Sequence, residues 1–254
     1  MNLYITRPYH APNFKICGAD EVLAAAFKLQ YGKYISETAV FDTYDINVTE
    51  LRGNILYEID TIIFENTVFD EAVIALHGSA VEWCGKVYMF LAGTESGKTT
   101  LSSYLTSRGY GYITDDCVLI TRENLLVHPY TCPVHLRDGG VDVLSAIGKR
   151  PPSLQLLDDA IMRRHIYVPA NCIMQPLPIG GIYFIRRSKT ENKVDELIAG
   201  ELCAKLVNTT MMLYPPIPSF MKLIARLLQI GCCELIYKDM DFVAETIERA
   251  GENV

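Results

Sequence analysis

The sequence lacks the features that define several large classes of protein. Its eight cysteines include no C-x-x-C pair, and eight thiols in 254 residues do not indicate a disulfide framework. Positive charge is not in excess, because Lys+Arg number 23 and Asp+Glu number 30, which gives a formal net charge of −7. That balance provides no electrostatic basis for general nucleic-acid binding. We therefore expect reduced thiols in a cytoplasmic protein and no nucleic-acid partner.

Long hydrophobic runs are also missing. No uninterrupted apolar stretch approaches the length that spans a bilayer, and the first eight residues have no basic segment leading into an apolar one. We expect neither a membrane partner nor a signal peptide. Half of the residues are nevertheless hydrophobic, which argues against disorder and hints at a buried contact in a homo-oligomer.

One stretch carries most of the chemical information. It fits the phosphate-binding loop [A/G]-x-x-x-x-G-K-[S/T], with an apolar, strand-like run at 86–91 before it and a helical pattern at 100–108 after it. The order strand, loop, helix is the one that the motif requires. The residues that we expect to bind nucleotide are Ala92, Gly93, Thr94, Glu95, Ser96, Gly97, Lys98, Thr99 and Thr100.

The chemistry of this loop follows from the helix that it opens. A helix N-terminus has unpaired N–H groups and the positive end of the helix dipole, so it attracts phosphate. Lys98 can place its ammonium on the β- and γ-phosphates, and the hydroxyl of Thr99 can ligate Mg²⁺. The alternative interpretation is a glycine turn that contains a lysine by chance.

Adjacent carboxylates follow the loop helix by one short strand-like segment. Asp115 and Asp116 lie between apolar residues at 110–114 and 117–120. Carboxylates in this position can hold Mg²⁺, and a second one can take the proton of an attacking hydroxyl. Successive strand side chains point to opposite faces, so both reach one site only at a strand end or bend. The alternative is a solvated turn.

Three other segments supply candidate site residues. His77 precedes Gly78 between two strand-like runs, and pairing of its strand with 86–91 through Cys84-Gly85 would bring it toward the loop. By itself such a histidine is more often a core or turn residue. Arg137 is a candidate for neutralising phosphate charge. Arg163 and Arg164 belong either to a solvated loop or to a clamp for the phosphoryl group or an acidic substrate.

The pattern predicts an α/β protein with two parts. Residues 1–70 form a small strand-rich N-terminal extension, in which 55–59 and 61–64 are expected as strands. Residues 71–254 form the P-loop domain. Within that domain the segment 141–163 is expected as one or two helices, broken by Pro151-Pro152.

The segment from about 72 to 120 resembles the catalytic domain of HPr kinase/phosphorylase, which phosphorylates a serine on a carrier protein. The shared features are His77-Gly78, Gly97-Lys98-Thr99 and Asp115-Asp116, at matching separations. The resemblance implies a mixed P-loop sheet of the HPr-kinase/PEP-carboxykinase-like type, with ATP and Mg²⁺ as cofactors. Lys98 and the loop would hold the phosphates, and Thr99, Asp115 and Asp116 would serve the metal.

The resemblance also assigns catalytic roles. Asp116 is favoured as the base, with His77 beside the transferred phosphoryl group and Arg137 stabilising its charge. The family's metal-binding glutamate corresponds to His135 here, and the lead-in is too short for the family's separate N-terminal domain. The chain is thus more similar to stand-alone relatives, some of which phosphorylate serine in peptide natural products such as lasso peptides.

These inferences lead to an expected function. The chain would be a kinase that transfers the γ-phosphoryl group of ATP to a hydroxyl, with a serine-bearing peptide or small protein as partner. The alternatives are a kinase of a small metabolite, a nucleotide-binding regulatory module without turnover, and a P-loop ATPase that drives a conformational change.

Overall fold

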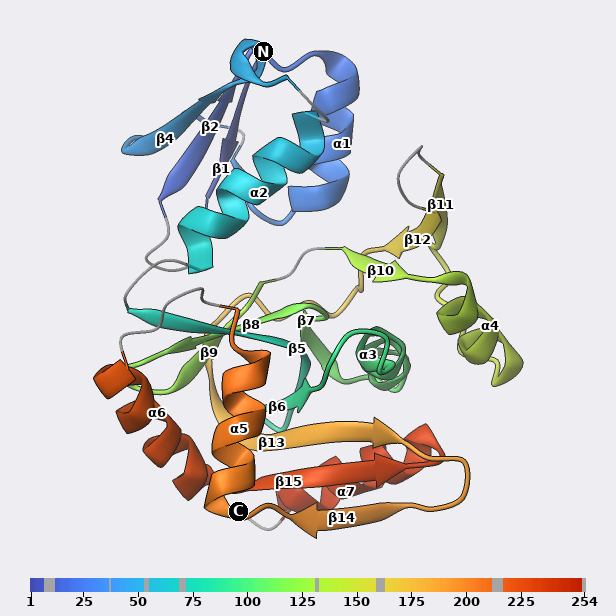
Figure 1. Cartoon of the computed structure of the whole chain (residues 1–254). Helices are drawn as coiled ribbons and strands as arrows, with labels where there is room; N and C mark the ends of the chain where they lie inside the picture. The colour runs from blue at the N-terminus through green and yellow to red at the C-terminus, as the bar shows by residue number, and fades with distance from the viewer. Residues whose placement is uncertain are drawn as a thin grey trace. The chain divides into compact units, whose positions relative to one another are not determined.

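The computed structural model describes residues 1–6, 12–36, 38–52, 55–68, 72–130, 133–158, 163–211 and 217–252 (Figure 1). The chain divides into two compact units, Met1–Val73 and Ile74–Val254. The P-loop, the acidic pair and the other candidate site residues all belong to the second unit.

The first unit combines a four-stranded sheet with two helices. The strand order is β3-β1-β2-β4, with β1 and β2 antiparallel and β2 and β4 parallel. The side chain of Asp20 caps the first helix by accepting a hydrogen bond of 2.7 Å from the Leu23 N–H. The elements are β1 (Asn2–Ile5), β2 (Asn13–Cys17), α1 (Glu21–Tyr31), β3 (Ile35–Ser36), β4 (Thr43–Asn47), the 3₁₀ turn η1 (Val48–Glu50) and α2 (Ile55–Val68).

The expected strands at 55–59 and 61–64 are wrong. Both segments lie in the single helix α2. Their β-branched content suggested strands, but the spacing of the apolar residues decides the outcome. Ile59 and Ile63 lie four residues apart, on one helical face, and both are fully buried.

The second unit is built on an eight-stranded mixed sheet. The order is β14-β15-β13-β6-β5-β8-β9, and β7 pairs with the C-terminal part of β5, at residues 80–82. Strand β13 runs parallel to β6 and β15, whereas β5 runs antiparallel to β6. The strands are β5 (Val73–Trp83), β6 (Lys86–Leu91), β7 (Gly111–Thr114), β8 (Cys117–Thr121), β9 (Leu126–His128), β13 (Leu177–Arg187), β14 (Lys193–Glu196) and β15 (Cys232–Tyr237).

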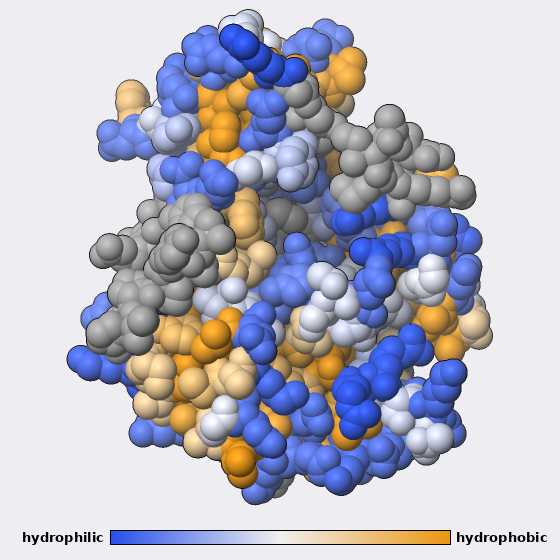
Figure 2. Space-filling view, viewed as in Figure 1, coloured by the Kyte–Doolittle hydropathy of each residue, from blue (hydrophilic) through white to orange (hydrophobic). Residues whose placement is uncertain are grey.

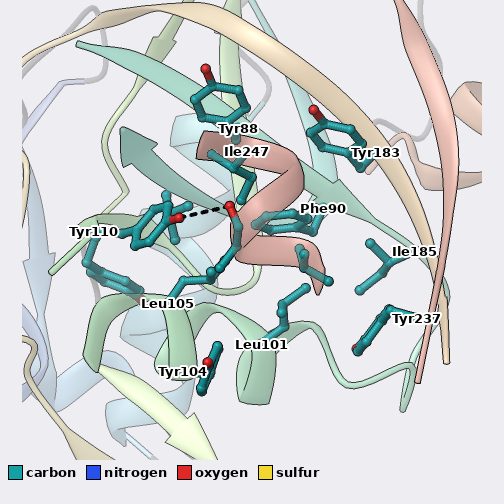
Figure 3. Close-up of a cluster of buried hydrophobic side chains, with 14 of the residues drawn as sticks. Tyr88, Phe90, Leu101, Tyr104, Leu105, Tyr110, Tyr183, Ile185, Tyr237 and Ile247 are labelled. Carbon is teal, nitrogen blue, oxygen red and sulfur yellow. Dashed lines mark hydrogen bonds between the residues drawn. The ribbon is translucent and has the colours of Figure 1, made fainter. Parts of the chain in front are cut away.

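Helices cover both faces of this sheet (Figure 1). Helices α3 (Lys98–Ser107) and α7 (Met240–Glu252) pack on one face, and α5 (Ala199–Thr209) and α6 (Ile217–Ile230) on the other. Alternate residues of β6 therefore enter different cores: Phe90 packs with α3 and α7, and Met89 with α5 and α6. Figure 3 shows the first of these cores, in which Leu101 and Leu105 of α3 meet Phe90. The P-loop helix is thus anchored by its apolar face.

A small three-stranded sheet has the order β10-β12-β11, and its strand β10 contacts the P-loop helix α3. Its elements are β10 (Val134–Leu136), α4 (Asp138–Ala146), β11 (Gln155–Asp158) and β12 (Arg163–Tyr167). The helical expectation for 141–163 is therefore only partly right, because α4 ends at Ala146 and residues 155–158 form a strand. The residues between β11 and β12 lie outside the described part of the chain.

The expected α/β class with a mixed sheet beneath the P-loop is confirmed. Within the described ranges, no helix combines the length and apolar character needed to cross a bilayer. Hydrophobic residues gather at the surface over α5 and α6 (Figure 2). Val207 of α5, Met221 of α6 and Ile198, which precedes α5, are exposed. A homo-oligomer remains a prediction.

Candidate active site

A tight hairpin brings His77 to the P-loop. Strands β5 and β6 pair antiparallel with Gly78 opposite Leu91, so His77 lies where β6 ends and the loop begins. The turn at Cys84 and Gly85 has φ values of 51° and 75°, the left-handed backbone that two-residue hairpin turns favour. The pairing expected from the sequence is therefore present.

Gly78 allows three backbone segments to meet beside His77. A Cβ at this position would lie 2.5 Å from Cδ2 of Leu91 and 2.9 Å from the carbonyl oxygen of Phe90. Any side chain would therefore force β5 and β6 apart. The Gly78 N–H also donates a hydrogen bond of 3.1 Å to the carbonyl oxygen of Asp116, which fixes the acidic turn against β5.

The P-loop has the backbone of an anion site. Gly97 adopts φ +90° at the N-cap of α3, and none of the described side chains caps that helix end. Lys98 is buried, and its Nζ donates hydrogen bonds of 3.0 Å to the Ala92 carbonyl and 2.7 Å to the Gly93 carbonyl. Burial lowers the pKa of Lys98, although the charges of Asp116 and Asp115 act in the opposite direction. A polyphosphate would bind both this desolvated ammonium and the N–H groups at the start of α3, which a helix leaves without partners of its own.

The two aspartates occupy a break between β7 and β8 and have different surroundings. Asp115 is buried: Tyr112 donates its hydroxyl to Oδ1 at 3.0 Å, and the His135 N–H donates to Oδ2 at 3.4 Å. Burial, followed by the charge of Asp116, raises the pKa of Asp115 to about 7. These effects outweigh the two hydrogen bonds, which favour the ionised form.

Asp116 is the accessible member of the pair. Its side chain is 72% exposed, and its Oδ1 lies 3.2 Å from Nδ1 of His77. The hydrogen bond from His77, together with the charges of Lys98 and Arg164, lowers the pKa of Asp116 despite partial desolvation. The other ring nitrogen of His77, Nε2, is buried and has no hydrogen-bond partner in the described part of the chain. His77 therefore contacts Asp116 through Nδ1.

Arg137 reaches the loop through an ion pair with Glu95. Arg137 is the N-cap residue of α4, and Glu95 adopts φ +62°, a left-handed conformation that is unusual for a residue with a side chain. His135 lies two residues earlier, on β10. Burial and the charge of Arg164 lower its pKa to about 4, so this imidazole is neutral near pH 7.

The structure thus brings Lys98, Asp115, Asp116 and His77 close together. Arg137 contacts the P-loop through its ion pair with Glu95. Thr99 and Thr100 lie in the first turn of α3, where a Cβ on Gly140 would come within 2.9 Å of Oγ1 of Thr100. Thr94 is exposed on the loop, and Ser96 donates its hydroxyl to the Gly93 carbonyl at 2.9 Å.

Sequence reasoning missed two contributors to this site, Tyr112 and Arg187, and left the role of Arg164 open. Tyr112 bonds Asp115, Arg164 acts on Asp116, and Arg187 packs against the loop, its Cδ 3.3 Å from where a Cβ on Gly97 would stand. The cationic triplet at 163–165 was a signal for Arg164, but it did not distinguish a clamp from a solvated loop. The side chain of Arg163 lies outside the described residues.

The residues present fit a magnesium nucleotide. Oxygen donors suit Mg²⁺, which is typically held by one or two carboxylates together with substrate phosphates. Thr99 and the acidic pair supply such donors near Lys98. Over the described ranges, no group of three His, Cys, Asp or Glu side chains is arranged to hold a metal ion.

The comparisons with known proteins give likeness to solved structures alone. No protein-family model matches the chain, and no curated protein matches its sequence. Among solved structures, the chain is similar to the Hpr(Ser) kinase/phosphatase from Coxiella burnetii, at 14% identity and a TM-score of 0.34. The match covers 69% of this chain and 93% of the other. At that TM-score the likeness carries no functional argument, and the site geometry must supply it.

Proposed function

We propose that this chain is an ATP- and Mg²⁺-dependent kinase that transfers the γ-phosphoryl group to a hydroxyl, such as a serine of a peptide or small protein. One observation carries the proposal. Three segments distant in sequence, at His77, Lys98 and Asp115–Asp116, converge around the N-terminus of α3. A phosphate-binding loop beside an accessible carboxylate provides the two functions that phosphoryl transfer to a hydroxyl needs.

Asp116 is assigned as the general base. It is exposed to an incoming hydroxyl, and His77 holds one of its oxygens at 3.2 Å. In the transfer, the acceptor oxygen forms a bond to the γ-phosphorus while the bond from that phosphorus to the β,γ-bridging oxygen breaks. The electron pair of the broken bond stays on ADP, and the hydroxyl proton passes to Asp116.

Asp115 is assigned a supporting role. Both of its oxygens accept hydrogen bonds from the protein, so it is poorly placed to receive a proton from an external hydroxyl. Its bond from the His135 N–H ties β10 to the acidic turn. When ionised, Asp115 and Asp116 would together attract Mg²⁺ to a position beside the phosphates.

The loop residues would bind and orient the nucleotide. Lys98 would exchange its two carbonyl partners for phosphate oxygens, and Thr99 would hold the metal through its hydroxyl. Bound Mg²⁺ would neutralise charge on the phosphates. Arg137, which forms an ion pair with Glu95 of the loop, would add a second cation close to the terminal phosphate.

The test combines binding with transfer. MgATP binding is measured by calorimetry, and transfer from γ-labelled ATP is measured with serine peptides, small proteins and hydroxyl metabolites as acceptors. We expect Lys98→Ala to weaken MgATP binding and Asp116→Asn to lower transfer at least about 100-fold. Arg249→Met is the control, because Arg249 is an exposed residue of α7 that bonds Glu245 within its own helix. Full activity in both site variants would contradict the proposal.

The same experiment separates the rival functions. Labelled metabolites without labelled peptides would identify a small-molecule kinase. Tight MgATP binding without any labelled product would indicate a regulatory module. Steady release of free phosphate without an acceptor would indicate an ATPase. Each outcome leaves the nucleotide site in place; the first replaces the proposed acceptor, and the other two rule out transfer to an acceptor.

A further inference from the structure

Arg187, the last residue of β13, lies against the P-loop. A Cβ built on Gly97 would stand 3.3 Å from Cδ of Arg187 and 3.5 Å from the hydroxyl oxygen of Tyr237. The guanidinium is bonded directly to that Cδ, so the charged group begins one bond beyond the contact. Gly97 is the N-cap residue of α3, where the N–H groups that attract phosphate begin. The contact therefore places a cation beside the anion-binding end of the loop.

The backbone sets the position of Arg187. In the parallel pair of β13 and β15, Arg187 is in register with Tyr237, and the Ser188 N–H donates a hydrogen bond of 2.8 Å to the Tyr237 carbonyl oxygen. Tyr237 belongs to the buried core that contains Leu101 of α3 and Ile185 of β13 (Figure 3). Alternate residues of a strand share a face, so Arg187 continues the row of Ile185 on the α3 side of the sheet.

The charge of Arg187 is not committed to another group. The residue is exposed, and none of the described carboxylates forms an ion pair with it. Arg137, by contrast, pairs with Glu95, and Nζ of Lys98 bonds two loop carbonyls. A guanidinium binds phosphate through paired donors. An arginine whose stem is fixed against the P-loop and whose charge lacks an anion is therefore suited to a phosphate ligand.

The strand order indicates which phosphates Arg187 can reach. Strand β6, which leads into the P-loop, lies between β5 and β13, and its Leu91 is in register with Gly78 on one side and Phe184 on the other. His77, which contacts the proposed base, therefore flanks the loop from β5. Strand β13 continues past Phe184 to Arg187 on the opposite side. Two strand spacings, roughly 10 Å, separate β5 from β13.

A nucleotide that spans this distance would have a reacting end and a retained end. The terminal phosphoryl group must lie beside the base, which leaves the other phosphates for the side of β13. We propose that Arg187 binds the α- and β-phosphates, which stay in ADP after transfer. The inference rests on the proposed function and deepens it, because it gives the retained phosphates a ligand outside the P-loop. Such an interaction is equally strong in the ground state and the transition state, so it lowers KM and leaves kcat nearly unchanged.

The test compares the affinities of MgATP and MgADP, measured by calorimetry, for the wild type, Arg187→Met and Arg187→Lys. Methionine keeps an unbranched stem against Gly97 and removes the charge. We expect Arg187→Met to weaken both nucleotides at least about tenfold and by similar factors. Arg187→Lys should lose less, because lysine keeps the charge but not the paired donors. The matched control is Arg186→Met, since Arg186 is an exposed arginine on the opposite face of the same strand, and its affinities should change less than about twofold.

Three results in the binding assay would overturn the inference. The first is unchanged affinity for both nucleotides in Arg187→Met. The second is a loss for MgATP without a loss for MgADP, which would assign the arginine to the terminal phosphate instead. The third is an equal loss in Arg186→Met, which would indicate a general effect of positive charge. Thermal melts of each variant identify loss of folding, and Arg187→Lys carries the test if Arg187→Met does not fold.

The transfer assay separates this inference from the proposed function. Arg187→Met should raise KM for ATP at least about tenfold and change kcat less than about threefold. A large loss of kcat at unchanged KM would contradict the assignment. If the wild type binds both nucleotides but phosphorylates no acceptor, the kinase proposal fails, and the affinities still decide the role of Arg187. If the wild type binds neither nucleotide, both proposals fail.

Discussion

Replacing Asp115 by asparagine should change how the stability of the second unit depends on pH. Asp115 is a buried acid whose pKa is raised from 3.8 to about 7 by burial and by the charge of Asp116. In the unfolded chain this carboxyl is solvated and ionises near its usual pKa. Asparagine has almost the same shape and does not ionise.

The sign follows from proton binding in the two states. Between pH 4 and pH 7 the folded state holds the proton of Asp115 more tightly than the unfolded state does, so deprotonation is linked to unfolding. The free energy of unfolding of the wild type therefore falls as pH rises through this window, and the Asp115 contribution flattens above about 7. At about 1.4 kcal/mol per pH unit, the change from pH 5 to pH 7.5 is about 3 kcal/mol. Asp115→Asn removes this contribution.

The single tryptophan makes the measurement specific to the unit that contains the site. Trp83 lies in β5 and stacks on Tyr110 with ring centroids 4.5 Å apart. Urea unfolding is followed by Trp83 fluorescence at pH 5 and at pH 7.5, in metal-free protein without nucleotide. The quantity compared is the difference in unfolding free energy between Asp115→Asn and the wild type, which should increase with pH.

Two further variants test the cause. Asp116→Asn removes the neighbouring charge, so the pKa of Asp115 should drop and the pH dependence should shrink. Tyr112→Phe removes a donor that favours the ionised carboxylate, so the pKa should rise and the fall in stability should extend to higher pH. A difference between Asp115→Asn and wild type that is the same at both pH values would refute the reasoning.

Two other predictions concern the loop and the strand beneath it. Gly78→Ala should destabilise the second unit by about 1–3 kcal/mol in the same Trp83 assay, because the new Cβ would lie 2.9 Å from the backbone carbonyl oxygen of Phe90 as well as 2.5 Å from Leu91 Cδ2. Wild-type stability would show that the hairpin can shift freely. Glu95→Gln should change stability by less than about 1 kcal/mol, since its pair with Arg137 is exposed, but it should slow phosphoryl transfer. In an Arg137→Met background, Glu95→Gln should have no further effect on the rate, and a further loss would rule out action through Arg137.

The local elements of the site were predictable because their signals are local. The P-loop is a contiguous motif, and the strand and helix around it have clear apolar patterns, so β6 and α3 were expected at nearly their observed positions. The pairing of β5 with β6, which brings His77 near the loop, followed from one short turn at Cys84-Gly85. These features require only a hairpin and a helix start, which the sequence encodes within a few residues.

The small sheet could not be predicted in the same way. Strand β12 pairs with β10, which lies before α4 in the chain, and with β11 after it. Nothing in the periodicity of 141–163 specifies that pairing, because tertiary contacts fix it. The effect of the Arg164 charge on Asp116 depends on where this pairing places β12, so the sequence alone left the role of Arg164 open.

Helix α2 was missed for a different reason. Its β-branched residues favour a strand by composition, yet the repeat of buried positions at Ile59 and Ile63 fits a helix. When composition and periodicity disagree, the pattern that buries apolar surface decides the structure.

The different roles of the two aspartates follow from the break between β7 and β8. In a continuous strand, Asp115 and Asp116 would point to opposite faces and only one could serve the P-loop. The break between β7 and β8, fixed by the bond from the Gly78 N–H to the Asp116 carbonyl, lets both carboxyls act on Lys98. It also places one carboxyl inside the protein and the other in solvent. The difference in pKa between the two aspartates therefore begins with one interrupted strand, which buries Asp115 and leaves Asp116 beside His77, and the charges of Lys98 and Arg164 lower the pKa of Asp116 further.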